Sequence, residues 1–449
     1  MSHPETLRGD EPPLLACVPP GPESRSWLVR AARVSAPMGP SPSTAVQRVK
    51  SEAATGAIVL ATAKGSAVVD VDRNRYVDLA AGFGALLLGH GHPSVLRAVA
   101  LESERLLLAL GDVYPSDAKI ALTERLAALH PEKGARVIVA QSGADAVTAA
   151  LKSAALATGR PGVVAFLGAY HGLSYAPLAA CGLRDGYRAP FAEQLNAHVT
   201  FVDYPGDDAT AARALSETRA VLLEGRVGAV LVEPILGRGG CVVPPDGFLR
   251  ALAALARENG ALLVADEIWT GLGRSGAMLR SHAEGVVPDL VCLGKGLGGG
   301  VPISACIGTD AVMRAWRREP EVVHTSTFAG APVACAAALA TLDVLSRERL
   351  VARSNDVGDR FRTALAAELA TLPGVAAVRG AGLMVGIDLG PRPGAASRAV
   401  GRLLAAGYIA STGGGGREVV VLTPALTIAE AQLDGFVAKV RGALQSLEA

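Results

Sequence analysis

Short apolar runs alternate with longer amphipathic stretches between about residues 115 and 310. Within each run, consecutive positions are apolar, so both faces of the resulting strand would be buried. Strands of that kind belong to a mainly parallel sheet that is covered by helices on both sides. The pattern predicts a large doubly wound α/β domain with strands at Arg136–Ala140, Gly162–Phe166, Val227–Pro234, Ala261–Glu267, Leu290–Leu293 and Ile303–Ile307.

One helix between these runs is well marked. Phe248, Leu252 and Leu255 recur at helical spacing and predict one apolar stripe. Asp246 can cap the start of this helix, and Gly260 can end it.

The flanks of the chain follow other patterns. Residues 1–45 are rich in Pro, Ser and Gly and are expected to form an irregular N-terminal arm. The stretch Gly65–Leu79 predicts a hairpin, because two apolar runs flank an Asp-Arg-Asn-Arg turn. After about residue 340 we expect helix, strand, helix, strand and helix, with a loop at Gly413–Gly416. The expected division is an arm (1–45), a first part of a smaller α+β domain (46–80), a large domain (81–335) and the rest of the small domain (336–449).

Composition narrows the class of protein. The chain has 449 residues, 50% of them hydrophobic, and a formal net charge of +1. No basic field is present to hold nucleic acid or anionic lipid, so neither is an expected partner. The six cysteines form no CxxC pair, which argues against a zinc site or a disulfide framework and fits a reducing cytoplasm. No apolar stretch is long enough to span a bilayer, and the N-terminus lacks the plan of a signal peptide.

Lys295 ends one of the apolar runs and is followed by a glycine-rich stretch. A lysine at such a junction is partly desolvated, which disfavours its ammonium form and frees a nucleophilic amine. An amine of this kind can form a Schiff base with an aldehyde such as pyridoxal 5'-phosphate. Taken alone, Lys295 is more simply a surface lysine after a strand.

Four further elements accompany this lysine. Ser142 and Asp145 form a capping box at the start of a helix, whose free N–H groups can hold a phosphate that Gly143 allows to approach closely. Tyr170 can lie flat on a planar ring. Asp266, at the carboxyl end of a strand, can keep a pyridine nitrogen protonated.

The fourth element, Ser326 with Thr327, offers two hydroxyl groups for a phosphate. Each element also has a purely structural interpretation: a helix cap, a packed Tyr beside a hydrogen-bonded His171, a turn-capping Asp and a polar turn. The five together, in this order, favour a pyridoxal phosphate site.

The series resembles the class III (ω-amino acid) aminotransferases of fold type I, from about Gly56 to Ile428. Matching motifs are Ser-Gly-Ala-Asp-Ala from Ser142, Tyr-His-Gly from Tyr170, Asp-Glu-Ile-Trp-Thr-Gly-Leu-Gly-Arg-Ser-Gly from Asp266, Gly-Lys-Gly-Leu-Gly-Gly-Gly around Lys295 and Ser-Thr-Phe-Ala-Gly from Ser326.

The resemblance implies a role for each matching residue. Lys295 would be the Schiff-base lysine and proton shuttle, Asp266 would pair with the pyridine nitrogen, and Tyr170 would stack on the ring with Ile268 behind it. The expected phosphate ligands are Ser142, Gly143 and Ala144, and Thr327 would reach the phosphate of the other subunit of a homodimer with shared active sites. The expected cofactor-binding set also contains His171, Glu233 and Ser326.

The departures from the family pattern concern the substrate. The stretch beginning at Glu233 carries Arg238 where the family has a second glutamate, and Val421 stands where ornithine and GABA enzymes of the family carry the arginine that pairs with it. Losing both partners together avoids a buried unpaired charge. Arg238 is therefore a candidate for binding a substrate carboxylate, with a solvent-facing arginine as the alternative. Trp269 replaces a common glutamine and is the second tentative substrate residue.

The resemblance implies an aminotransferase that moves an amino group from an amine or ω-amino acid to a 2-oxo acid with ping-pong kinetics. An amino-acid racemase, epimerase or aminomutase would use the same framework, and a catalytically silent cofactor-binding homologue is a third interpretation. The sequence does not identify the donor or the acceptor.

Overall fold

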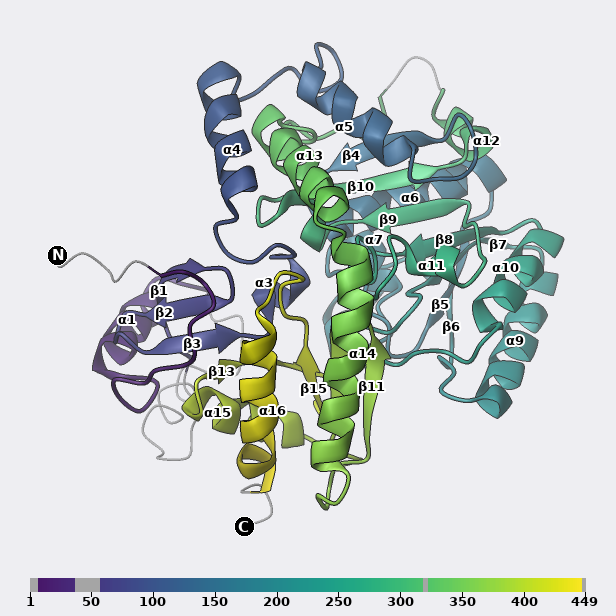
Figure 1. The fold of residues 1–449 in the computed structure, drawn as a ribbon. Helices are drawn as coiled ribbons and strands as arrows, with labels where there is room; N and C mark the ends of the chain where they lie inside the picture. The colour runs from purple at the N-terminus through teal and green to yellow at the C-terminus, as the bar shows by residue number, and fades with distance from the viewer. Residues whose placement is uncertain (1–6, 37–56, 318–321, 446–449) are drawn as a thin grey trace.

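A computed structural model describes residues 7–36, 57–317 and 322–445. Residues 37–45 of the expected arm and the first residues of the expected small domain lie outside this description. The described part is built around a seven-stranded sheet (Figure 1). Its spatial order is β4 (Arg136–Ala140), β10 (Ser304–Gly308), β9 (Leu290–Leu293), β8 (Leu262–Asp266), β7 (Val227–Val232), β5 (Gly162–Phe166) and β6 (Val199–Val202).

The sheet is parallel except for one strand. β10 runs antiparallel to both of its neighbours, β4 and β9, while the remaining pairs are parallel. β4 therefore points the same way as β9, and the carboxyl ends of six strands meet at one edge. The prediction of a mainly parallel sheet is confirmed, and the six predicted strands match within one or two residues.

Helices cover both faces of this sheet because alternate strand residues turn apolar side chains to each side. α6 (Gly143–Thr158) lies on one face, where its alanines pack against Leu231, Cys292 and Cys306. On the other face, α9 (Asp208–Leu223) and α10 (Phe248–Glu258) pack against β5, β7 and β8. α5 (Asp117–Ala127) and α13 (Pro332–Arg347) cover β4, β10 and β9 on that same face.

The predicted helix near residue 250 is α10, and its apolar stripe is buried as expected. Its start was assigned wrongly: the N-cap is Gly247, with a φ of 86°, and no side chain caps the helix. Asp246 precedes that left-handed residue, so its carboxylate does not stand at the cap position. Gly260, with a φ of 68°, follows the helix end as predicted.

The two ends of the chain share a second, four-stranded sheet. β1 (Leu60–Lys64), β2 (Ala67–Asp70) and β3 (Arg75–Asp78) form an antiparallel meander that contains the predicted hairpin. β13 (Tyr408–Ile409) extends it in parallel to β3, which joins the N-terminal and C-terminal parts of the chain.

The C-terminal part holds more strands than predicted. A third sheet has the order β11 (Ala377–Ala381), β12 (Met384–Asp388), β15 (Val419–Leu422) and β14 (Ser411–Gly413). These strands are only three to five residues long, so their alternation is too brief to detect in the sequence. α14 (Leu350–Leu369), α15 (Ala395–Ala405) and α16 (Glu430–Gln445) pack on these sheets (Figure 1).

The expectation of an irregular arm was wrong for one segment. α1 (Pro22–Ala32) begins with a proline in its first turn, and Asp72, from the β2–β3 turn, accepts hydrogen bonds from the Glu23 and Ser24 N–H groups. The cap comes from about 50 residues away in the sequence, so no local pattern predicts it.

The remaining helices are short connections or lie beside the large sheet, where α13 packs against α4 and α5. None of the helices in the described ranges is long and apolar enough to cross a membrane. The remaining helices are α3 (Ala81–Gly84), α4 (Pro93–Arg105), α7 (Tyr175–Ala179), α8 (Asp185–Arg188), α11 (Arg280–Ala283) and α12 (Asp310–Met313), with 3-10 turns at Ala189–Gln194, Lys295–Gly298 and Arg314–Trp316.

Candidate active site

Five segments that follow strands of the large sheet converge at the edge where the parallel strands end. They follow β4, β5, β7, β8 and β9 and carry the chemistry that the sequence singled out. Ligands of open α/β sheets bind outside the carboxyl ends of the strands, so this edge is where a site is expected.

Lys295 lies two residues after β9 and begins a 3-10 turn in a left-handed conformation, with a φ of 39°. Its Nζ lies 3.8 Å from the centroid of the Trp269 ring. Burial lowers the pKa of the Lys295 amine to about 8; the carboxylates of Glu233 and Asp266 oppose this change, and Arg238 and Arg274 add to it. An amine with this pKa has a larger neutral fraction near physiological pH than an ordinary lysine, and that fraction is available as a nucleophile.

Asp266 ends β8, the strand next to β9, so the two residues come from neighbouring strands as predicted. Its Oδ2 lies 2.7 Å from Nδ1 of His171, and its Oδ1 accepts a hydrogen bond from the Ile268 N–H. Both side chains are almost fully buried, and Nε2 of His171 has no partner among the described residues. The contact with His171 therefore holds the Asp266 carboxylate in one orientation.

Glu233 connects the segments after β5 and β7. Its carboxylate accepts hydrogen bonds from the Tyr170 N–H at 2.7 Å and from the Gly237 N–H at 2.9 Å. Burial raises the pKa of Glu233, His171 lowers it and Asp266 raises it further. The contacts fix the backbone of Tyr170, whose ring faces the Arg238 guanidinium with 4.7 Å between Cζ and the ring centroid.

The predicted capping box is present at the start of α6. The Ser142 Oγ accepts from the Asp145 N–H at 3.2 Å, and the Asp145 carboxylate accepts from the Ser142 N–H at 3.1 Å. A side chain at Gly143 would come within 3.0 Å of the Ile268 side chain, so the close approach requires glycine there. Gly294 packs against both residues, which brings the α6 N-terminus to the residue before Lys295.

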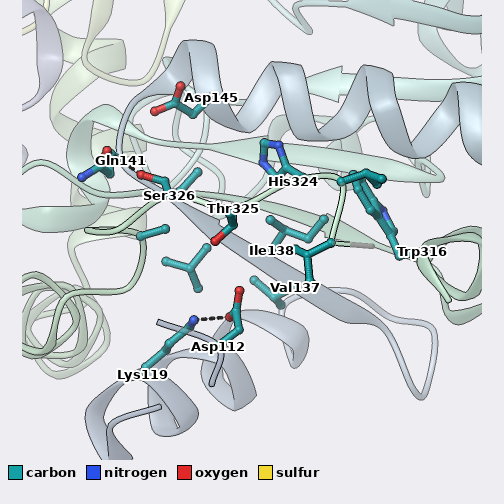
Figure 2. A pocket seen from close by; sticks show the side chains of 15 residues that line it. Asp112, Lys119, Val137, Ile138, Gln141, Asp145, Trp316, His324, Thr325 and Ser326 are labelled. Carbon is teal, nitrogen blue, oxygen red and sulfur yellow. Dashed lines mark hydrogen bonds and ion pairs between the residues drawn. The ribbon is translucent and has the colours of Figure 1, made fainter. Parts of the chain in front are cut away.

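The segment that carries Ser326 and Thr327 precedes α13 and lies near the start of α6. The Ser326 Oγ donates a hydrogen bond to the Gln141 side chain at 3.0 Å, as Figure 2 shows. This segment and β4 line a cavity of about 440 Å³ together with Asp112 and Lys119. Thr327 is exposed, and no hydrogen bond joins its side chain to another candidate residue within the described residues.

Two of the three residues that depart from the family pattern lie among apolar groups. Trp269 and Val421 are buried in one cluster with Ile235, Cys241 and Met384. Trp269 fits only because Gly84 and Gly237 flank it: a Cβ on either would come within 2.5 Å of its ring. No local pattern in the sequence relates residues 84 and 237 to a tryptophan at 269, so neither glycine was predicted to contact it.

The second missed feature is the glycine lip, formed by Gly237–Cys241 and Gly413–Gly416. The Gly414 N–H donates to the Arg238 carbonyl at 2.8 Å, and Arg184 donates to the Gly415 and Gly414 carbonyls at 2.7 and 2.9 Å. The four glycines marked a loop in the sequence but gave no signal of its partner.

Arg274 is the third missed feature. It is buried and donates hydrogen bonds to the carbonyls of Leu383 and Pro424, and no acid is paired with it among the described residues. Desolvation lowers the pKa of this guanidinium to about 9. Arg274 thus links the segment after β8 to the C-terminal sheet.

Comparison with known proteins agrees with this geometry. Residues 49–444 match the family model for "Aminotransferase class-III". The acetylornithine aminotransferase of Mycobacterium bovis is 41% identical over 410 residues, covering 89% of this chain and 96% of that protein. The acetylornithine aminotransferase of Methanothermobacter thermautotrophicus is 35% identical over 380 residues, covering 85% and 92%.

Solved structures lead to the same family. An amine transaminase from an uncultivated Pseudomonas species, in its PLP-bound form, has a TM-score of 0.82 and 28% identity, covering 92% of this chain and 98% of that one. The ornithine aminotransferase of Toxoplasma gondii has a TM-score of 0.80 and 28% identity, covering 94% and 95%. The fold is that of the type I pyridoxal phosphate enzymes, and this chain belongs to the class III aminotransferases.

Proposed function

We propose that the edge of the large sheet is the active site of this transaminase, with Lys295 as the nucleophile and Arg238 as the receptor for a substrate carboxylate. The observation that carries the proposal is the convergence of a buried amine, an oriented carboxylate and a helix N-terminus on one edge. Pyridoxal phosphate is the cofactor of the family.

The residues present fit that cofactor. The Lys295 amine has no hydrogen bond or ion pair within the described ranges, so it is available for a covalent bond. The first N–H groups of α6 and the Ser142 hydroxyl proton can hold a phosphate, since Ser142 Oγ only accepts in the capping box. Asp266, held by His171, would pair with the pyridine nitrogen and keep it protonated.

Each residue then has a defined task. When bound, pyridoxal phosphate supplies an aldehyde carbon and an electron-withdrawing ring. Tyr170 would lie against that ring with Ile268 opposite. Lys295 would take the proton from the donor carbon that bears the amine and deliver it to the carbon that the cofactor supplies as an aldehyde, which its lowered pKa favours near neutral pH. The amino group would move from donor to acceptor in two half-reactions, and this order gives ping-pong kinetics.

Arg238 supports the carboxylate assignment through its surroundings. Its guanidinium stacks on Tyr170 and forms no ion pair within the described part of the chain. A guanidinium without an acid is suited to a bidentate carboxylate. Val421, which replaces the expected partner arginine, is fully buried behind the glycine lip, so no charge competes for Arg238 there.

The substrate class follows from these features. We propose a donor with a primary amine at one end and a 2-oxo acid acceptor whose carboxylate binds Arg238. Relatives named acetylornithine aminotransferases make N-acetylornithine the first donor to test.

A donor screen tests the proposal. N-acetylornithine, ornithine, 4-aminobutyrate and simple amines are each paired with pyruvate and with 2-oxoglutarate, and the 2-oxo and amino products are quantified. Arg238→Ala should raise the acceptor KM about tenfold to a hundredfold with a smaller change in kcat. Arg213→Ala, on the exposed face of α9, is the matched control. An unchanged KM for every acceptor contradicts the carboxylate role, and inversion at Cα without amino transfer contradicts the transaminase assignment.

We further propose that the enzyme is a homodimer with shared active sites. The segment after α4 exposes Leu107, Leu110, Val113 and Tyr114, each about 70% accessible, and Val322 and Phe328 are exposed in the segment that carries Thr327. Asp112 of the first segment and Val322 of the second line one cavity (Figure 2), so the two segments with exposed apolar side chains lie close together. A patch of this kind is typical of a protein interface.

The dimer is tested by light scattering and cofactor titration. Leu110→Glu with Val113→Glu should yield a monomer that binds pyridoxal phosphate at least tenfold more weakly, because Thr327 then reaches no second site. Leu223→Glu, an exposed leucine of α9, is the matched control. A variant that becomes monomeric but binds the cofactor with unchanged affinity contradicts shared sites.

The six cysteines are all free thiols, which supports a cytoplasmic location.

A further inference from the structure

Trp269 lies at the centre of the site and has a position that its neighbours determine. Trp269 is 5% exposed, and its ring packs directly against the two glycines that flank it. Its Nε1 has no hydrogen-bond partner among the described residues. The indole is therefore placed by packing and not by a polar contact.

The Lys295 ammonium lies over the face of this ring. At 3.8 Å, the distance between Nζ and the ring centroid is well within the range of a cation–π contact, and indole is the best aromatic partner for a cation. The groups that act electrostatically on Lys295 are Glu233 and Asp266, which favour its charge, and Arg238 and Arg274, which oppose it. No ion pair of Lys295 with either acid occurs within the described residues, so the ring is its direct contact.

We propose that the face of Trp269 is a positioning site for the free Lys295 side chain. The ring holds this side chain beside the reacting carbon whenever Lys295 is not bound to the cofactor. The inference rests on the proposed role of Lys295. A lysine on a flexible stem has many rotamers, and a defined resting place shortens its return to the reaction. Trp269 is a positioning residue in this scheme and does not exchange protons.

The proposal has a signature in the apoenzyme. A ring that stabilises the ammonium raises the pKa of Lys295 against the effect of burial. Removing the aromatic face by Trp269→Leu should lower that pKa by about half a unit to one unit, and Trp269→Phe should lower it less. The full-length apoenzyme is mixed with pyridoxal phosphate between pH 6 and 10, and the rate of cofactor capture is followed by absorbance. The wild-type rate should rise with pH with a midpoint near 8, because only the neutral amine reacts.

Fluorescence provides a second readout that needs no cofactor. Replacing Trp27 and Trp316 by Phe leaves Trp269 as the only tryptophan, and its emission should titrate with the same midpoint as cofactor capture. Adding Lys295→Met should abolish that titration. The Trp27→Phe, Trp316→Phe background is the matched control and should leave the capture midpoint unchanged, since Trp27 contacts Arg30 and Trp316 contacts Ser153 and His324.

The outcomes separate this inference from the proposed function. Flat Trp269 emission, or a capture midpoint that stays or rises in Trp269→Leu, overturns the positioning role even if the enzyme transaminates. If Trp269→Leu does not fold, the Trp269→Phe midpoint and the emission titration decide the matter. Failure of the proposed function is seen separately, as a chain that transfers no amino group while Trp269 emission still titrates.

Discussion

The sheet edge around Lys295 and the glycine lip around Arg238 border the same site, but different forces hold them. At the sheet edge, polar side chains are matched to polar partners, as His171 is to Asp266 and as Glu233 is to two backbone N–H groups. The lip is held by backbone hydrogen bonds, by the Arg184 side chain, which donates to two of its carbonyls, and by apolar packing against Val421. A network of matched polar groups tolerates few substitutions, whereas apolar packing tolerates many. On the proposed roles, the side that would hold the cofactor is therefore chemically constrained, and the side that would bind the substrate is free to change.

The largest expected effect comes from removing the amine at the sheet edge. Lys295→Ala should lower kcat at least about a thousandfold and abolish the covalent attachment of cofactor, because the nucleophile is also the proton shuttle. Turnover and mass spectrometry after borohydride reduction measure both. Lys64→Ala, at the exposed end of β1, should leave both unchanged. Covalent cofactor in Lys295→Ala would mean that another lysine carries the reaction.

The next largest effect distinguishes two adjacent acids, Asp266 and Glu267. Asp266→Asn should lower kcat about a hundredfold or more, since a neutral amide does not keep the ring nitrogen protonated. Glu267 points the other way and accepts hydrogen bonds from Ser281 and Thr270. Glu267→Gln should change kcat less than tenfold. Steady-state kinetics of both variants at saturating cofactor measure this difference. Equal losses of kcat would contradict the assignment of the ring-nitrogen contact to Asp266 alone.

Substitutions at the lip should change the stability of the protein more than its catalytic rate. Val421→Arg places a charge in a fully buried position and should lower the free energy of unfolding by about 3 kcal/mol. Adding Arg238→Glu supplies a partner and should restore part of that loss. Urea unfolding of the single and double variants measures the coupling, and strictly additive losses would indicate that the two positions do not meet.

The smallest effect is a pH dependence carried by Glu267. Burial raises its pKa, so the folded state keeps this proton to a higher pH than the unfolded chain does. Its contribution to stability is therefore fully present below pH 4.5 and falls as pH rises from there through the folded pKa. Glu267→Gln should lower stability by about 1–3 kcal/mol at pH 4.5 and by less at neutral pH. Urea midpoints across this range test the trend, and a gap that widens with pH would reverse the sign.

Sequence patterns predicted the large sheet, the capping box at the start of α6 and the place of Asp266 at a strand end, because each depends on local signals. Ser142 with Asp145, and Asp266 at a strand end, are positioned by the element in which they occur. The glycine lip, the Gly84 and Gly237 contacts with Trp269, and the buried Arg274 link segments that are far apart in the sequence. Tertiary packing alone decides such contacts, as it decides the Asp72 cap of α1.

The reversed strand β10 has a consequence for how the chain matures on the ribosome. β10 separates β4 from β9, and Ser304 pairs with Ala140, which is 164 residues earlier (304 − 140). At about 5–20 residues per second, β4 waits for roughly ten to thirty seconds before its only neighbour in the large sheet is synthesised. We therefore expect the pairing edge of β4 to stay open in nascent chains shorter than about 310 residues, and an open edge of this kind favours aggregation.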